Sequence, residues 1–324
     1  MRAGGQGLWA KARKGVVLVA TSAALLSACA TPPTLQGRAT QPPPQRIAAP
    51  IISAVPSAQS TALRAYYADV QAQLLAQGLM RTDDGATDAP FSARQLANNF
   101  IRIAFFDEFD SSSGTLVARA TEKRLRRWDK PLRVGLTFGS SIPKTKRATE
   151  TARIRSFLNR LSKLTGHPIA LATTNINFSL NILNTDEIQA LGPTIRRTDP
   201  DIGAPELDAI VNMPQSTYCQ VTTSINDDTN LIERAFAVIR AEHPDLLHLS
   251  CLHEEIAQGL GLPNDSPAAR PSIFNDDQEF ALLTPMDEMM LKMLYNPALT
   301  PGMTADQARP IIDQLATALV GGDS

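Results

Sequence analysis

The sequence predicts one α+β domain built on a mixed β-sheet, in which a central helix near residue 250 carries the main motif. Three observations support this fold class. Short apolar or alternating runs, typical of strands, occur both before and among amphipathic helical segments. No internal repeat divides the 324 residues, and a hydrophobic content of 43% is ample for a substantial core.

The first elements of the predicted domain are helical. Apolar residues from Leu63 to Leu75 recur at helical spacing, and a second helix begins after Ser92, a favourable N-cap residue. The apolar stretch 101–109 fits either a strand or a continuation of that helix. A strand is expected at 131–139, and an amphipathic helix at 147–164.

Strands and helices then alternate. Four further strands are expected, at 168–174, 177–183, 218–225 and 234–241. Three further helices are expected, at 247–260, after the capping residue Thr284, and from Thr304 to the glycines near 321. The segment 184–215 is polar and contains several prolines and glycines, so it is predicted to be irregular.

The N-terminus has the features of an export signal. Basic residues up to Lys14 precede an apolar run at 15–26 that is too short to span a bilayer comfortably. The tetrapeptide Leu26-Ser27-Ala28-Cys29 follows and resembles the bacterial lipobox, in which the cysteine is lipidated and becomes the first mature residue. An ordinary secretory signal with an incidental cysteine is the alternative.

The lipobox resemblance implies a division of the chain into three parts. Residues 1–28 would be a signal peptide, 29–60 a lipidated Cys29 with a Pro-rich linker, and 61–324 the globular domain. The lipid would hold the protein on a membrane of the cell envelope, facing the periplasm. Ala30 stands where an Asp favours inner-membrane retention, so the outer membrane is the expected destination.

The charge and the cysteine content of the chain bear on nucleic-acid binding and on the role of its thiols. A formal net charge of -1, without a basic tract, gives no electrostatic basis for binding nucleic acid. Beyond Cys29 two cysteines remain, Cys219 and Cys251. In an oxidising compartment such a pair is expected to form a disulfide rather than to bind metal or act as a nucleophile.

The stretch "CLHEEIAQGLGLPND" at 251–265 contains the main motif. Read from His253, a zinc site of the HExxH type would place its second ligand at Ala257, which has no lone pair. Read from Glu254, the row becomes Glu254-Glu255-x-x-Gln258-x-x-Gly261-x-x-Asn264, followed by Asp265. This second spacing resembles that of the metzincin metallopeptidases, HExxHxxGxxH or HExxHxxGxxD.

Each part of that spacing has a physical reason. Residues four apart share a helix face, so two ligands can converge on one metal, and the Glu after the first ligand can act as general base. A glycine accepts positive φ and turns the chain back, so that a third ligand can reach the same metal. Glu255 occupies the general-base position and Gly261 the turn, whereas Glu254, Gln258 and Asn264, with Asp265 one place later, replace the ligands.

Downstream residues extend the resemblance. Ser272, Ile273 and Phe274, followed by Asn275, are similar to the Ser-Ile-Met-Asn turn beneath a metzincin metal, and the helix after Thr284 is similar to the one that closes such domains. Residues 90–300 resemble an uncharacterised bacterial domain family related to metzincins. Its hallmark is a Cys followed by Glu-Glu-x-x-Gln-x-x-Gly-Leu and Asn-Asp. The resemblance implies a single zincin-like domain.

Two functions remain open from the sequence. The replaced ligand positions are oxygen donors, which suit Ca²⁺ or Mg²⁺ rather than zinc, so no zinc cofactor is expected. The first hypothesis is a lipid-anchored module without catalysis that binds a peptide or an envelope protein. The second is a divergent metallopeptidase that uses another divalent cation, oxygen ligands and Glu255 as general base.

Overall fold

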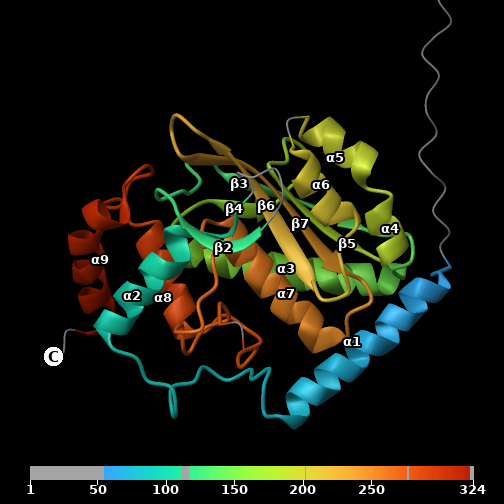
Figure 1. Ribbon diagram of the computed structural model, residues 1–324, viewed down its shortest axis with the longest axis horizontal. Coiled ribbons are helices and arrows are strands. Elements are labelled where there is room, and N and C mark those ends of the chain that lie inside the picture. The colour runs from blue at the N-terminus through green and yellow to red at the C-terminus, as the bar shows by residue number, and fades with distance from the viewer. Residues whose placement is uncertain (1–54, 111–116, 201, 276, 322–324) are drawn as a thin grey trace, which may run out of the picture. The chain divides into compact units, whose positions relative to one another are not determined.

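A computed structural model describes residues 55–110, 117–200, 202–275 and 277–321 (Figure 1). The predicted signal peptide, the lipidated Cys29 and the linker up to residue 54 lie outside the described residues. The chain divides into two units, 1–48 and 49–324, and all described residues belong to the second. Helices and a mixed sheet make up this unit, which confirms the predicted α+β class.

The sheet has five strands in the order β4-β3-β5-β7-β6. Pairing is parallel from β4 through β7, and only the edge strand β6 is antiparallel to its neighbour. The bounds of the strands are β3 Leu132–Phe138, β4 Ile169–Leu171, β5 Phe178–Leu183, β6 Cys219–Asn226 and β7 Leu231–Arg240. A separate antiparallel pair is formed by β1 Phe106–Asp110 and β2 Val117–Glu122.

Helices precede, join and follow these strands. The stretch 101–109 fits two interpretations in sequence, and both are found in part: α2 continues to Ala104, and β1 then starts at Phe106. The bounds of the helices are α1 Ala58–Ala76, α2 Ala93–Ala104, α3 Lys144–Thr165, α4 Thr185–Gln189, α5 Gly192–Thr198, α6 Ala204–Val211, α7 Asp245–Gly259, α8 Pro285–Leu294 and α9 Ala305–Val320.

The prediction of an irregular segment at 184–215 is wrong. This segment forms α4, α5 and α6. Asn184 and Glu187 make a reciprocal capping box on α4, and a proline occupies the first turn of both α5 and α6. Prolines that suggested irregular chain therefore mark helix starts, where the missing N–H is tolerated. Ile195 and Ile210 of these short helices are buried.

The register of the strands separates two cores. Alternate residues point to opposite faces, so Ala237 of β7 faces the same side as its neighbours Leu180 and Val221, while Val238 faces the other side. The first face carries the main core, to which α3 and α7 contribute. The second face carries a smaller core formed with α4, α5 and α6.

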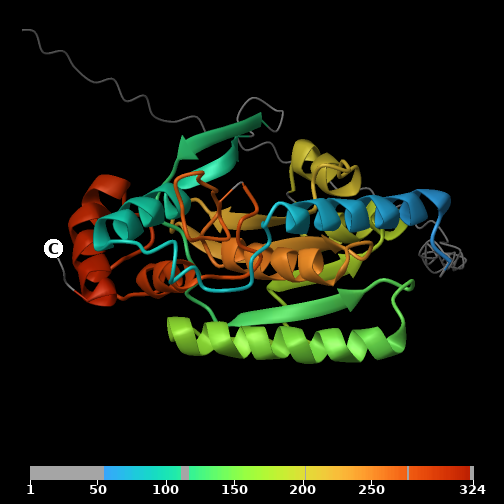
Figure 2. The same ribbon diagram turned by 90° about the horizontal axis from the view of Figure 1, so that it is seen from below.

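The remaining helices lie at the ends of the sheet. Helices α2, α8 and α9 pack against one another on one side of the unit (Figure 1). Helix α1 lies against α4 (Figure 2), where the Ser57 amide donates to Asp186. Among the described residues, no helix combines the length and the apolar character that crossing a membrane requires.

Candidate functional site

Helix α7 carries the motif and packs beside β6 and β7. Its last residue comes very close to the sheet. A Cβ atom on Gly259 would lie 2.4 Å from the ring of Phe178 and 3.4 Å from Val221, so the contact needs glycine. The indole Nε1 of Trp128 donates to the Gly259 carbonyl at 2.8 Å and satisfies a carbonyl at the helix end. These contacts fix the motif helix relative to the edge strand.

Cys219, the first residue of β6, forms a disulfide with Cys251 of α7. The two Cα atoms are 5.9 Å apart, within the normal range for this bond, and the predicted pairing is confirmed. The disulfide covalently joins the edge strand to the motif helix. Because both sulfurs are oxidised, neither offers the thiolate that metal binding or nucleophilic attack requires.

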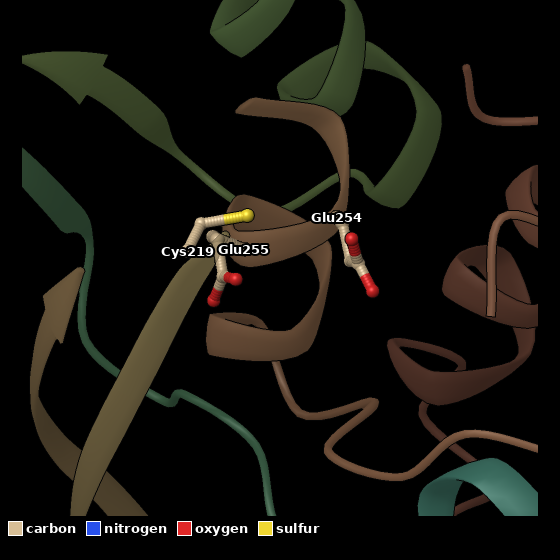
Figure 3. A group of neighbouring side chains, drawn as sticks. All are labelled: Cys219, Glu254 and Glu255. Carbon is tan, nitrogen blue, oxygen red and sulfur yellow. The ribbon is translucent and has the colours of Figure 1, made fainter. Parts of the chain in front are cut away.

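Glu254 and Glu255 follow the disulfide by one helical turn. A carboxylate oxygen of each lies within 4.8 Å of the other and of the Cys219 sulfur. Figure 3 shows the sulfur at the turn of α7 that carries both glutamates, with the two carboxylates emerging on different sides of that turn. Glu255 is buried and Glu254 is partly exposed. The arrangement places two acidic groups at the start of the edge strand.

The other replaced ligand positions do not all meet. Gln258 Nε2 donates to Asp265 Oδ1 over 3.4 Å, so these two side chains come together. Asn264 is buried, and its Nδ2 donates instead to the carbonyl of Arg102 at 2.9 Å. Asn264 thus holds the chain against α2, while Asp265 is the residue that returns towards the motif helix.

Gly261 makes the turn that the motif spacing requires. Its φ is +120°, in the range that favours glycine, and it follows the helix by two residues. A Cβ atom there would lie 2.5 Å from the carbonyl oxygen of Arg126. Both the backbone conformation and the close neighbour therefore demand glycine at this position.

The turn at Ser272, Ile273 and Phe274 is buried and tied to α8. The Ser272 hydroxyl donates to the carboxylate of Asp287, and the Ile273 amide donates to the same carboxylate at 3.0 Å. The Phe274 amide donates to the Ser272 hydroxyl at 3.0 Å, and its ring is fully buried. The sequence indicated this turn, but not that Asp287 holds it.

None of the four histidines, all of which are described, joins the group formed by Glu254 and Glu255. The His253 ring stacks on Phe157 with centroids 4.0 Å apart, and its Nδ1 accepts from the Leu283 amide at 3.1 Å. Burial lowers the pKa of His253 to about 3, so the ring is neutral. His248 Nε2 lies 3.2 Å from a carboxylate oxygen of Glu150, in a buried pair.

The structure brings together a second group of polar residues that the sequence did not indicate. Arg240, Glu242 and His243 lie at the carboxyl end of β7 and are each no more than 2% exposed. His243 Nδ1 lies 3.8 Å from the Cys251 sulfur, and burial lowers the pKa of this histidine well below its usual value. The available signal was a set of ionisable residues at the end of the apolar run 235–239, because the carboxyl ends of strands are where α/β sheets bind ligands.

The region that contains the sheet and the motif helix matches a known sequence family. Residues 93–314 match the family described as "Protein of unknown function (DUF2927)". No curated protein and no solved structure matches the chain. The match starts at the first residue of α2 and ends within α9, so α1 precedes it.

Proposed function

The chain belongs to this family of proteins of unknown function (DUF2927), and we propose that its domain is a binding module without zinc peptidase chemistry. Its ligand is an extended peptide or protein segment that carries a cationic residue. A lipid on Cys29 holds the module at the cell envelope. The pairing of an exposed-edge strand with two adjacent carboxylates, at β6 and Glu254-Glu255, is the observation that carries this proposal.

The donor atoms argue against zinc. A zinc peptidase site needs three nitrogen, sulfur or carboxylate ligands that converge on one ion. Beside Glu254 and Glu255, the third candidate donor is Cys219, and its sulfur is committed to the disulfide. The nearest imidazole in sequence, His253, is stacked on Phe157 and bonded to the Leu283 amide. The zinc ion that the metzincin resemblance implies does not fit these residues.

The edge strand supports peptide binding. Strand β6 pairs on one side with β7, and within the described part of the chain its other side forms no strand ladder. Such an edge presents N–H and C=O groups to which an extended peptide can add as a further strand. All eight residues of β6 are partly exposed. The disulfide at Cys219 holds this strand at a fixed position relative to α7.

The carboxylates give the proposed site a charge preference. Glu254, which is partly exposed, and the buried Glu255 lie beside the Cys219 end of β6. Gln258 follows one turn further along α7, and Asp265, which lies beyond the helix, contacts it. Complementary charge mainly increases the association rate and the selectivity for a partner. A peptide with lysine or arginine near one end therefore suits the site better than an acidic one.

Peptide titration tests this function. We expect a soluble decapeptide of alternating lysine and threonine to bind the full-length protein in calorimetry and to perturb NMR signals of residues 219–226. Glu254→Lys should weaken binding about tenfold, the effect of one close charge interaction. Asp313→Lys, an equal charge change at an exposed position on α9, should leave it intact. Absence of binding, or equal effects of both variants, would contradict the proposal.

A divergent metallopeptidase is the second candidate. The contact between Gln258 and Asp265 favours it, because both side chains carry oxygen donors of the kind that Ca²⁺ or Mg²⁺ accepts. Glu254 lies one turn before Gln258 on the same side of α7 and carries donors of the same kind. Metal analysis of the purified protein separates the two candidates. Stoichiometric metal, together with peptidase activity that disappears in Glu255→Gln, would establish the enzyme and overturn the binding module.

The lipid anchor has its own test. The sequence of basic residues, apolar run and Leu26-Ser27-Ala28-Cys29 supports acylation of Cys29. We expect the protein to fractionate with membranes, by our proposal the outer membrane, and the Cys29→Ala variant to lose this association. A variant that stays membrane-bound would rule out the anchor.

A further inference from the structure

A cavity of about 530 Å³ lies at the carboxyl ends of β5 and β7, on the second face of the sheet. Its walls come from α1, from α4 and from the chain that follows α6. The volume falls within the range of small-molecule sites. The location matches the crevice outside the carboxyl ends of parallel strands, where such sheets bind ligands. Neither the motif on α7 nor the proposed peptide site uses this cavity.

Arg240, on the wall of the cavity, is the main chemical feature of the site. The residue is 1% exposed. Its Nε donates to the Thr217 carbonyl at 3.1 Å, and its Nη2 donates to the carbonyls of Met213 and Pro214 at 2.7 and 2.9 Å. Within the described residues no carboxylate lies within 4.0 Å of this guanidinium, so Nη1 takes part in no ion pair. The Tyr67 ring lies 5.9 Å from the guanidinium carbon, but a ring does not neutralise the charge. A buried cation with no carboxylate within 4.0 Å is costly, which favours an anion beside it.

Glu242 is the acidic residue closest to Arg240 in sequence, but other groups hold it. Its Oε1 accepts from the Ser60 hydroxyl at 2.7 Å and from the Thr185 amide at 2.8 Å. The Glu242 carboxylate thus links α1 and α4 to the sheet through hydrogen bonds. It interacts with Arg240 only electrostatically, over a longer distance. The side chain is 1% exposed and does not line the cavity. A ligand in the cavity therefore faces the cation rather than the acid.

The walls limit the kind of anion. Apart from Arg240, the lining residues are uncharged: apolar Leu63 and Ile188 stand beside the amide side chains of Gln189 and Gln215. One guanidinium balances one negative charge, whereas a phosphate dianion would leave a charge uncompensated. The planar fork of arginine also matches the geometry of a carboxylate. From this we infer that the cavity binds a small organic monocarboxylate, with its acid group towards Arg240 and its apolar body along α1.

Helix α1 completes this site from outside the matched family region. It spans Ala58–Ala76, whereas the family match begins at residue 93. Few of its residues are buried. Its long-range hydrogen bonds join Ser60 to Glu242, Tyr67 to the Gln215 carbonyl, and Gln71 to the Leu247 amide. A carboxylate bound between α1 and the sheet would add to these contacts. Ligand binding should therefore stabilise α1 on the domain.

The test uses N-acetylleucine, a monocarboxylate with an apolar body, and its neutral amide, N-acetylleucinamide. With the full-length protein, we expect N-acetylleucine to bind at millimolar concentration and to perturb NMR signals of residues 59–66 and 211–217. The amide should bind about tenfold more weakly, because it lacks the charge-assisted bond to Arg240. Equal binding of the two compounds, or no binding of N-acetylleucine, would overturn the inference.

A substitution on α1 provides a matched control. Arg240 also holds the chain at 213–217, so its removal would disturb the fold. Ala62 is exposed and lines the cavity, while Ala65 is exposed on the same helix but does not line it. We expect Ala62→Trp to abolish binding and Ala65→Trp to preserve it. Binding that survives in Ala62→Trp would place the ligand elsewhere. Glu254→Lys should not affect N-acetylleucine, so this inference and the proposed peptide function can fail separately.

Discussion

The Asp287 carboxylate accepts hydrogen bonds from the Ser272 hydroxyl and from the backbone amide of Ile273. These bonds join a buried turn to the first turn of α8. The carboxylate also accepts from the Thr284 amide at 2.8 Å. Asp287 is completely buried, and this burial raises its pKa to about 6, against the opposing effect of the hydrogen bonds. One side chain therefore positions the turn that follows the motif.

Removing this carboxylate should destabilise the domain strongly. Asp287→Ala leaves the donors of Ser272, Ile273 and Thr284 buried without their acceptor, and we expect a loss of about 3 kcal/mol in the free energy of unfolding. Urea denaturation measures the loss. Asp313→Ala, at an exposed position on α9, is the control and should change stability by less than about 0.5 kcal/mol. Similar losses in both variants would show that Asp287 has no special role.

His253 should make the protein sensitive to acid. Its pKa is lowered from 6.5 to about 3 in the folded state, so the unfolded chain binds the proton more readily. The contribution to stability is present above pH 6.5 and is lost as the pH falls towards about 3, by at most about 1.4 kcal/mol per pH unit. His243 acts in the same direction.

The variant His253→Gln isolates this effect, because glutamine can still accept from the Leu283 amide. Denaturation curves recorded from neutral to acidic pH should show a shallower loss of stability in the variant than in the wild type. Asp287, whose pKa is raised, contributes in the opposite direction and is unchanged in both proteins. Identical slopes would mean that His253 does not titrate as described.

The disulfide should contribute substantially to stability. Cys219 and Cys251 are 32 residues apart in sequence, and closing a loop of this size is worth about 2–4 kcal/mol. We expect the double variant Cys219→Ser, Cys251→Ser to unfold at lower urea concentration by this amount. Mass spectrometry of the purified wild-type protein should find the two cysteines linked. Free thiols in that sample would contradict the disulfide.

Gly261 should tolerate no side chain. Gly261→Ala places a Cβ atom 2.5 Å from the Arg126 carbonyl at a φ of +120°, and we expect a loss of about 2–4 kcal/mol. Gly78→Ala is the matched control, since Gly78 also has positive φ, +77°, but open space around it. Its loss should stay near 1 kcal/mol. The difference in thermal unfolding between the two variants measures the close contact itself.

Local signals in the sequence predicted the elements on either side of the site. The capping residues Ser92, Thr284 and Thr304 each begin a helix, as expected, because they satisfy amide groups of the first turn wherever the helix packs. The prediction failed at 184–215. There, prolines and glycines favour irregular chain by local pattern, whereas burial on the second face of the sheet stabilises three short helices.

The sequence by itself determined the α+β class, the cysteine pair and the spacing from Glu254 to Asp265, because these depend on periodicity, composition and short-range geometry. Only the tertiary structure decided which side chains meet. It separated Asn264 from Gln258, stacked His253 on Phe157, and buried Arg240 beside a cavity closed by α1. Contacts of this kind depend on the order and register of strands far apart in the chain, which no local pattern of residues encodes.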